Sequence, residues 1–258
     1  MKSVNKDTIR KAFTEQSYAF ENDKMGFSKQ EYLDYITSKI APTKNDVVLE
    51  MAAGTCACGR TVARYVKNIT CLDITPAMLS VGKSESEKMG LTNISFVVGD
   101  AAEIPFPNDS FDTVFSRLAF HHFPNTERPF AEMARVLKKG GKLALIDIEA
   151  VGTELQHIND KIETLRDCSH IHSLSKSEMT TLFENNGLKI MSYDNITVPK
   201  KLDDWLGLTK ISRKNKTLIT NLIKSEINGG NKTGLYPYIK NGNIYFNHTW
   251  AVIVGIKE

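Results

Sequence analysis

Two adjacent histidines are the residues of this sequence best suited to proton transfer. His121 and His122 lie in residues 118–124, directly after a strand expected at residues 112–117. The unperturbed pKa of a histidine side chain is about 6.5, so either ring could take up a proton at neutral pH. We predict that at least one of the two is catalytic, and the alternative is that the pair is structural or solvated.

A loop of small residues is the second feature that could do chemistry. Val47, Val48 and Leu49 form a short apolar run, and residues 54–59 separate this run from a helical pattern that begins near Val62. Small side chains let the backbone approach a ligand closely, and the free amides at the start of the helix face the same crevice. The strand, loop and helix therefore predict a ligand-binding site.

A carboxylate narrows the choice of ligand. Asp73 closes the next expected strand, residues 69–73, about twenty residues after the glycine loop, where α/β nucleotide folds keep the acid that binds ribose hydroxyls. Gly54, Cys56 and Gly59 occupy the three positions of a G-x-G-x-x-G motif. A cysteine side chain at the middle position would crowd a pyrophosphate. We therefore expect a ligand that contains ribose but is not NAD.

The elements that position these residues alternate along the chain. Segments rich in apolar or β-branched residues at 47–49, 69–73, 94–98 and 143–148 predict strands, and a further strand is expected at residues 112–117. Residues 126–139 have the spacing of an amphipathic helix, which we expect Gly140 and Gly141 to end. Because strands and helices alternate five times, the sequence predicts an α/β fold with a parallel sheet that is covered on both faces.

Five motifs in order resemble the class I S-adenosylmethionine-dependent methyltransferases. They lie at residues 50–56, 73–79, 99–106, 111–112 and 135–143, so the resemblance covers roughly residues 45 to 150. Within that superfamily the chain is most similar to the small-molecule branch that includes the ubiquinone and menaquinone biosynthesis C-methyltransferases. The family usually has glycine where Ala52 and Cys56 stand.

The resemblance implies a fold, a cofactor and an activity. The fold is a doubly wound, mostly parallel, seven-stranded sheet of Rossmann-like type with an antiparallel last strand. The cofactor is S-adenosylmethionine, and the activity is methyl transfer to an oxygen or activated carbon of a small, partly apolar molecule. We expect ten residues at the cofactor, with a turn role as the alternative for Asp100 and a surface ion pair for Arg117. They are Glu50, Ala52, Gly54, Thr55, Asp73, Ile74, Met78, Asp100, Ala101 and Arg117.

The acceptor site is expected from segments at both ends of the chain. The resemblance implies a helical lid over residues 1–45, a methyltransferase domain over residues 46–258, and a helical insertion at about residues 201–240 that roofs the acceptor. The alternative for each aromatic or histidine side chain in these segments is packing in the core. The candidate acceptor contacts are Phe13, Tyr18, Trp205, Tyr236 and His248.

Composition excludes several other functions. The chain has 258 residues, and its 33 basic and 30 acidic residues give a formal net charge of +3, which favours no polyanionic partner such as nucleic acid. No apolar run approaches the about 18 residues that span a bilayer, so we expect a cytoplasmic protein without stable membrane insertion. The four cysteines are expected as reduced thiols, and the single Cys56-Ala-Cys58 pair does not predict a metal site. The oligomeric state stays open, a homodimer included.

Two functions of other classes compete with methyl transfer. A dinucleotide-dependent oxidoreductase is disfavoured by Cys56 and would bind NADH tightly. A binding module that has lost transfer would bind S-adenosylmethionine without converting it. The sequence contains no damaged motif that favours this second alternative.

Overall fold

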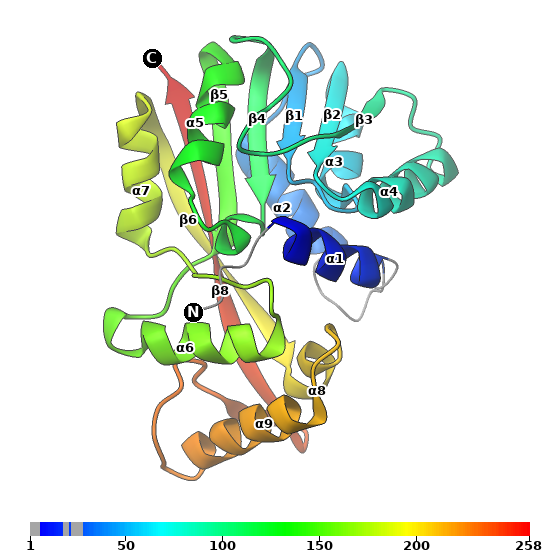
Figure 1. Ribbon diagram of the computed structural model, residues 1–258. Coiled ribbons are helices and arrows are strands. Elements are labelled where there is room, and N and C mark those ends of the chain that lie inside the picture. Colours follow the sequence, from blue (N-terminus) through cyan, green and yellow to red (C-terminus); the bar gives the residue numbers. More distant parts are fainter. Residues whose placement is uncertain (1–5, 18–20, 22–27) are drawn as a thin grey trace.

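The sheet is the central element of the fold. The structure is a computed structural model, and it describes residues 6–17, 21 and 28–258. Eight strands of these residues form one sheet (Figure 1). Seven of them have the order β3-β2-β1-β4-β5-β8-β6, and β7 pairs with residues 243–245 at the start of β8. The strands are β1 (Val47–Met51), β2 (Asn68–Asp73), β3 (Ile94–Val98), β4 (Phe111–Arg117), β5 (Leu137–Ile148), β6 (Leu188–Lys201), β7 (Tyr238–Lys240) and β8 (Asn243–Lys257).

The strand directions confirm the expected fold class. Strands β3, β2, β1, β4 and β5 pair in parallel, whereas β8 is antiparallel to both β5 and β6. The three-residue strand β7 is an addition to the seven expected strands. It forms a tight hairpin with β8 because Asn241 and Gly242 both have positive φ angles, 49° and 72°, as a two-residue hairpin loop requires.

Side chains alternate between the two faces of the sheet. Along β1, Val48 joins one core cluster and Leu49 the other, since successive strand residues point to opposite faces. Helices α5 and α7 cover the face of Leu49, and α2, α3 and α4 cover the face of Val48. The helices are α1 (Lys6–Gln16), α2 (Gln30–Ile40), α3 (Ala57–Val62), α4 (Pro76–Lys88), α5 (Glu127–Val136), α6 (Thr153–Arg166), α7 (Lys176–Asn185), α8 (Leu202–Leu206) and α9 (Arg213–Ile227).

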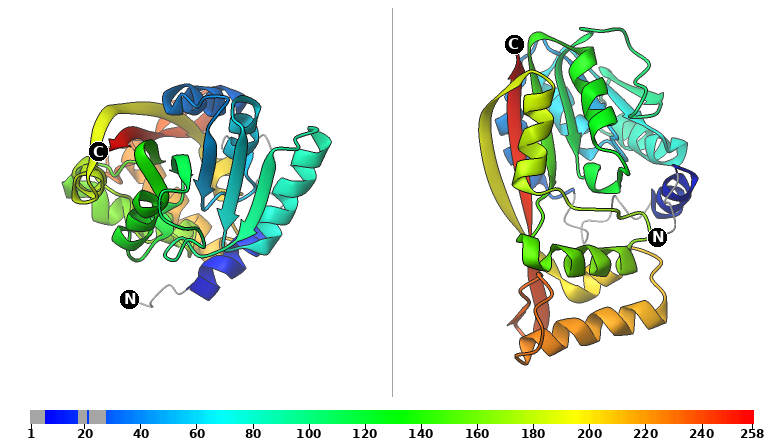
Figure 2. Two further views of the ribbon diagram at one scale, coloured as in Figure 1. Left: turned by 90° about the horizontal axis from the view of Figure 1, so that it is seen from above. Right: turned by 60° about the vertical axis from the view of Figure 1, so that its left-hand side comes forward.

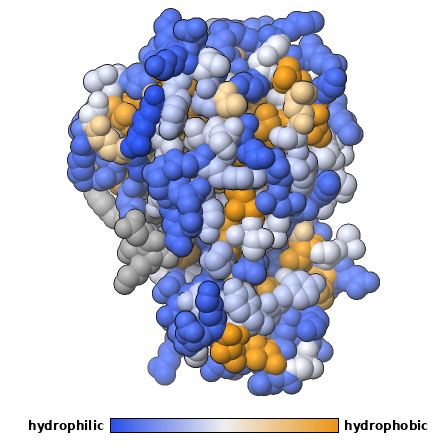
Figure 3. Space-filling model, turned by 180° about the vertical axis from the view of Figure 1, so that it is seen from behind, coloured by the Kyte–Doolittle hydropathy of each residue, from blue (hydrophilic) through white to orange (hydrophobic). Residues whose placement is uncertain are grey.

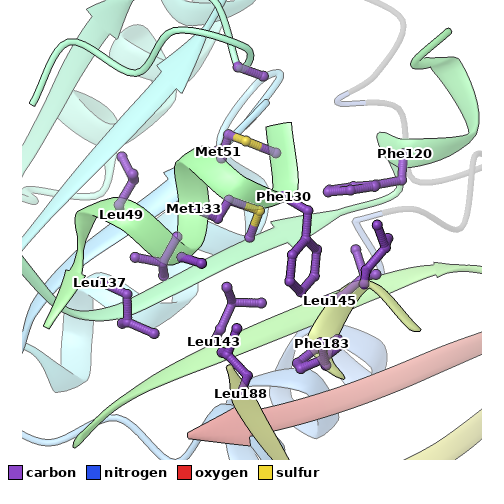
Figure 4. Packing of buried hydrophobic residues seen from close by; sticks show 14 of the residues in the cluster. Leu49, Met51, Phe120, Phe130, Met133, Leu137, Leu143, Leu145, Phe183 and Leu188 are labelled. Atoms are coloured by element: carbon purple, nitrogen blue, oxygen red, sulfur yellow. The ribbon is translucent and has the colours of Figure 1, made fainter. Parts of the chain in front are cut away.

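The larger core cluster lies between the sheet and the helices α5 and α7 (Figure 4). Phe130 of α5 packs on Phe183 of α7 with ring centroids 4.9 Å apart, and both rings are fully buried. Gly255 of β8 lies under Phe183, because a Cβ at Gly255 would come within 2.7 Å of that ring. Burying a phenylalanine contributes about 1.5–3 kcal/mol, so this cluster fixes α5 and α7 on the sheet.

The helix expected over residues 126–139 ends earlier than the sequence predicts. Helix α5 stops at Val136, and Leu137 pairs with Phe111 at the start of β5. The register then shifts before Thr113 pairs with Lys142, so residues 138–141 form an irregularity in the strand. The buried Leu137 side chain belongs to the core, which favours strand pairing over one more helical turn.

A helical lobe stands below the carboxyl ends of the parallel strands. We use this name for α6, α8 and α9, which share a core cluster that includes Trp205, Ile223 and Phe246. The long strands β6 and β8 continue from the sheet into this lobe (Figure 2). The helical insertion expected at about residues 201–240 contains α8 and α9.

The surface is mostly polar on the side seen from behind. Hydrophilic residues cover most of that side, and hydrophobic residues lie in separate patches (Figure 3). No helix within the described ranges is long and apolar enough to cross a membrane.

Candidate active site

A cavity of about 390 Å³ lies at the carboxyl ends of the parallel strands. Its walls come from the loops after β1, β2, β3 and β4, from α1, and from residues of the helical lobe. Figure 1 shows α1 and α6 facing the strand ends from below. Ligands in open α/β sheets bind outside the carboxyl ends of the strands, so this cavity is the candidate active site.

The loop after β1 has an unusual backbone. Ala52, Gly54 and Cys56 have positive φ angles of 52°, 55° and 61°. Glycine adopts this region without strain, whereas other L-residues lose roughly 1–2 kcal/mol there. A Cβ at Gly54 would meet nothing within 4 Å, so the loop is open on the side of the cavity.

The Cys56 side chain points away from the cavity. It is fully buried in the core cluster of α2, α3 and α4, and it is absent from the described residues that line the cavity. Its Sγ lies close to Gly82 of α4, where an added Cβ would be 3.0 Å from the sulfur and 2.7 Å from the Thr55 carbonyl oxygen. The expectation that Cys56 would crowd a ligand is therefore wrong, because the thiol packs behind the loop.

Asp73 joins the loop after β1 to the loop after β2. Its Oδ2 accepts a hydrogen bond from the Gly54 amide at 2.8 Å, and its Oδ1 accepts one from the Thr75 amide at 2.8 Å. Burial raises the pKa of Asp73, and these two amides oppose that rise. Each carboxylate oxygen has a second lone pair, so the residue can hold the loops and still accept from two ribose hydroxyls.

The loop after β3 adds a second carboxylate to this side of the cavity. Asp100 Oδ1 accepts a hydrogen bond from the Ala102 amide at 2.9 Å, so it has the turn role and also lines the cavity. Ala52, Thr55, Ile74, Met78, Ala101 and Arg117 also line it. An open loop, two carboxylates and the apolar Ile74 and Met78 therefore lie on one side of the cavity.

Glu50 lies behind the loop and is absent from the described lining of the cavity. Its Oε2 accepts hydrogen bonds from the Gly59 amide at 2.8 Å and from the Cys71 thiol at 3.6 Å. Burial raises the pKa of Glu50 to about 7, although Arg117 opposes the rise. The expected contact between Glu50 and the cofactor is therefore not supported by its position. Its carboxyl group holds the start of α3 instead.

The histidine pair forms the short helix η4 (Phe120–His122) after β4. His121 Nδ1 lies 2.5 Å from Asp147 Oδ1, and Asp147 also accepts from the amides of Ala119 and Phe120 at 3.1 and 2.6 Å. Burial lowers the pKa of His121, but the charge and hydrogen bond of Asp147 outweigh burial and raise it overall. Asp147 is ionised, since His121 and backbone amides lower its pKa against the effect of burial.

His122 has the opposite electrostatic environment. Its Nδ1 lies 3.0 Å from the Ser169 carbonyl oxygen, which fixes a proton on that nitrogen. Burial and the neighbouring charge of His121 lower the pKa of His122 to about 3. The Phe13 ring of α1 meets it edge to face, with ring centroids 5.0 Å apart. Both histidines line the cavity, but only His121 is basic.

The far wall of the cavity comes from the helical lobe. His248 Nε2 lies 3.0 Å from Glu163 Oε1, and Arg166 Nε donates to Glu163 Oε2 at 3.2 Å. The Arg166 guanidinium lies 5.1 Å from the centre of the Trp205 ring. Trp205, His248, Arg166 and Asp167 line the cavity together with Phe13.

Two expected acceptor contacts do not reach this wall. Tyr236 lies in the loop before β7 and is 60% exposed. It is absent from the described residues that line the cavity. Tyr18 lies outside the described residues.

Several residues in the wall of the cavity or directly behind it were not predicted from the sequence. Asp147 had a usable signal, because it nearly closes β5 as Asp73 closes β2. Arg166 and Asp167 stand at the end of an amphipathic helix, and Ile9 lies on α1, where no local pattern marks a site.

Known proteins place the chain in a family. A family model described as a methyltransferase domain matches residues 49–145. The methyltransferase YcgJ of Bacillus subtilis is 30% identical over 213 residues, which cover 81% of this chain and 83% of YcgJ. The chain belongs to the S-adenosylmethionine-dependent methyltransferases.

Other comparisons agree with this membership of the methyltransferases. The crystal structure of YcgJ matches with a TM-score of 0.81 at 26% identity, covering 89% of this chain and 99% of that one. A demethylmenaquinone methyltransferase of Listeria monocytogenes is 36% identical over 107 residues, which cover 40% of this chain and 45% of the relative. The activity is methyl transfer from S-adenosylmethionine, and the comparisons give no support to the oxidoreductase or the inactive binding module.

Proposed function

We propose that this methyltransferase methylates an oxygen or an activated carbon of a small, partly apolar molecule held beside His121. The observation that carries the proposal is that one continuous cavity joins the loops after β1, β2 and β3 to His121, which Asp147 holds, and to Trp205. One cavity with a nucleoside end and an aromatic, basic end can hold a methyl donor and an acceptor in contact.

The cofactor end divides into three contacts. We assign the ribose hydroxyls to Asp73, the adenine edge to Asp100 and Ala101, and the adenine face to Ile74 and Met78. Residues 52–55 and Arg117 then border the methionine end. S-adenosylmethionine supplies a methyl group that is already activated on a sulfonium, so the protein mainly aligns the acceptor, a contribution that can reach effective molarities of about 10⁵ M.

His121 is the proposed proton acceptor. Its Nδ1 faces the ionised Asp147 and keeps a proton, so Nε2 holds the lone pair in the neutral ring. An acceptor O–H or activated C–H gives its proton to Nε2, and the Asp147 carboxylate stabilises the resulting imidazolium. A positioned base of this kind contributes about 10²- to 10⁴-fold in rate. His122 is too weak a base for this role because its pKa is about 3.

Residues 1–45 are proposed as a lid, and residues 46–258 as the transfer domain with its acceptor roof at about residues 201–240. Ile9 and Phe13 of α1 line the cavity, and Trp205 lines it from α8, which supports both assignments. We also propose a cytoplasmic location, supported by the free thiols of Cys56, Cys58, Cys71 and Cys168.

The proposal is tested in two stages on the purified chain. Calorimetric titration should give micromolar binding of S-adenosylmethionine and S-adenosylhomocysteine and no binding of NADH. Transfer of a ¹⁴C-methyl group to small phenols and enols should then fall about 10²- to 10⁴-fold in His121→Ala, with unchanged affinity for S-adenosylhomocysteine. The matched His122→Ala variant should lose far less. An unaltered rate in His121→Ala would remove this residue from the reaction.

A further inference from the structure

Two residues that line the cavity each carry a buried nitrogen that has no hydrogen-bond partner among the described residues. The nitrogens are Trp205 Nε1 and His248 Nδ1. Trp205 is 2% exposed and His248 is 7% exposed, and both residues line the cavity. A buried polar group without a partner is destabilising, so two of them at one place point to a ligand that completes the site.

The two nitrogens have opposite roles. An indole N–H can only donate a hydrogen bond. Burial raises the pKa of Glu163, but the charge of Arg166 and the bond to His248 outweigh burial and lower it, so Glu163 is ionised. The ionised oxygen accepts a hydrogen bond from His248 Nε2–H, which keeps the proton on Nε2 and leaves a lone pair on Nδ1. The wall therefore presents one donor, from Trp205, and one acceptor, from His248.

The surroundings keep these roles fixed. Burial lowers the pKa of His248, so its ring is neutral and Nδ1 stays an acceptor. The Arg166 guanidinium lies 5.1 Å from the centre of the Trp205 ring, where its charge draws electron density from the indole and makes the N–H a stronger donor. Arg166 also holds Glu163, so one cation supports both partners.

A hydroxyl group matches this pair better than other small polar groups. The two rings are neighbours, with centroids 6.4 Å apart and an interplanar angle of 85°. A hydroxyl oxygen can accept one hydrogen bond and donate another at the same time. A ketone or an ether can only accept a hydrogen bond, which would leave His248 Nδ1 without a donor. An ammonium can only donate, which would leave the Trp205 N–H without an acceptor.

We propose that the methyl acceptor carries a hydroxyl group that binds between Trp205 and His248, accepting from the indole N–H and donating to the imidazole Nδ1. The inference rests on the proposed function and narrows it to hydroxylated, partly apolar acceptors such as phenols and enols. The apolar part of the acceptor then lies against the apolar lining, where Leu208 and Phe13 are available.

Matched pairs of small aromatics test the inference on the full chain loaded with S-adenosylhomocysteine. The probes are phenol with anisole and 2-naphthol with 2-methoxynaphthalene, because each ether keeps the oxygen and loses only the donor. Ligand-observed NMR should give dissociation constants at least tenfold lower for the hydroxyl member of a pair. His248→Phe removes the acceptor of the hydroxyl proton and should reduce this preference to less than threefold, whereas Trp205→Phe removes a donor that both oxygens use and should weaken binding of both members of each pair.

Trp250→Phe is the matched control. Its indole is also buried with an unpartnered Nε1, but Trp250 is absent from the described lining of the cavity, so the preference should be unchanged. Retained binding of S-adenosylhomocysteine shows that each variant is folded. Equal or absent binding of both members in every pair, a preference that survives in His248→Phe, or unchanged binding of both members in Trp205→Phe overturns the inference. Failure of the wild-type chain to bind S-adenosylhomocysteine would instead overturn the proposed function.

Discussion

The two ends of the cavity are built in different ways. At the cofactor end, Asp73 and Asp100 each follow a strand, and backbone amides such as Gly54 N hold them in place. At the acceptor end, side chains from distant segments meet in a buried polar network, as His248 and Glu163 do across 85 positions of sequence. Local sequence therefore builds the proposed cofactor end, whereas tertiary packing builds the proposed acceptor end.

The largest effect in this comparison is expected at the acceptor end. Asp147→Asn removes the charge that raises the pKa of His121, so the turnover number should fall by about 10²-fold or more. The rate depends on neutral His121, and activity rises as pH increases through the pKa of that ring. Because this pKa drops in the variant, the acidic limb of the kcat/KM profile should move to lower pH.

Asp160→Asn is the control for this prediction. Asp160 holds His170 at 2.9 Å in a similar carboxylate–histidine pair, but neither residue is among the described residues that line the cavity. The acidic limb of the kcat/KM profile of Asp160→Asn should coincide with that of the wild type. An unmoved limb in Asp147→Asn would show that His121 does not govern the rate.

The second effect belongs to the cofactor end. Asp73→Ala removes the acceptor of the Gly54 and Thr75 amides together with the proposed ribose contact. Each charge-assisted bond contributes about 1.5–3 kcal/mol, so calorimetry should show at least tenfold weaker binding of S-adenosylhomocysteine. Asp34→Ala, on the exposed side of α2, should bind as the wild type does. Unchanged affinity in Asp73→Ala would refute the ribose assignment.

A smaller effect is expected where α4 supports the loop. In Gly82→Ala the new methyl group would lie 2.7 Å from the Thr55 carbonyl oxygen. Overpacking lowers the free energy of unfolding by about 1–3 kcal/mol, and the better helix propensity of alanine raises it by about 1 kcal/mol. Thermal unfolding should therefore show a modest net loss of stability. Binding of S-adenosylhomocysteine should weaken as the loop moves. Gly152→Ala, whose added methyl meets nothing, should leave that affinity intact, and equal affinities in both variants would contradict the support by α4.

The smallest effect is expected at Cys56. Cys56→Gly relieves a positive φ angle of 61° but removes a buried thiol, and the two changes of about 1 kcal/mol oppose each other. Because the thiol lies behind the loop, affinity for S-adenosylhomocysteine should change less than threefold by calorimetry. A gain of tenfold or more would mean that the cysteine side chain contacts the ligand after all.

The same contrast explains what the sequence could predict. The five central strands, Asp73 and the loop around Gly54 follow from periodicity and spacing, because their partners lie within one strand, loop and helix. The orientation of Glu50 did not follow, since spacing places a residue at a strand end without telling whether its side chain enters the cavity or the core.

The acceptor end was predictable only in part. Trp205 and His248 were marked by residue type alone, and Tyr236 was marked by the same reasoning yet lies on the surface. Their partners Glu163 and Arg166 come from α6, and no local pattern connects that helix with β8. A polar network between segments that far apart is visible only once the chain is folded.

A crystal structure of the complex with S-adenosylhomocysteine tests the division of the cavity most directly. We predict the ribose hydroxyls on the Asp73 carboxylate, the adenine against Ile74, and the sulfur on the side of the cavity that faces His121. A ribose bound elsewhere, or a sulfur that faces away from His121, would contradict the account.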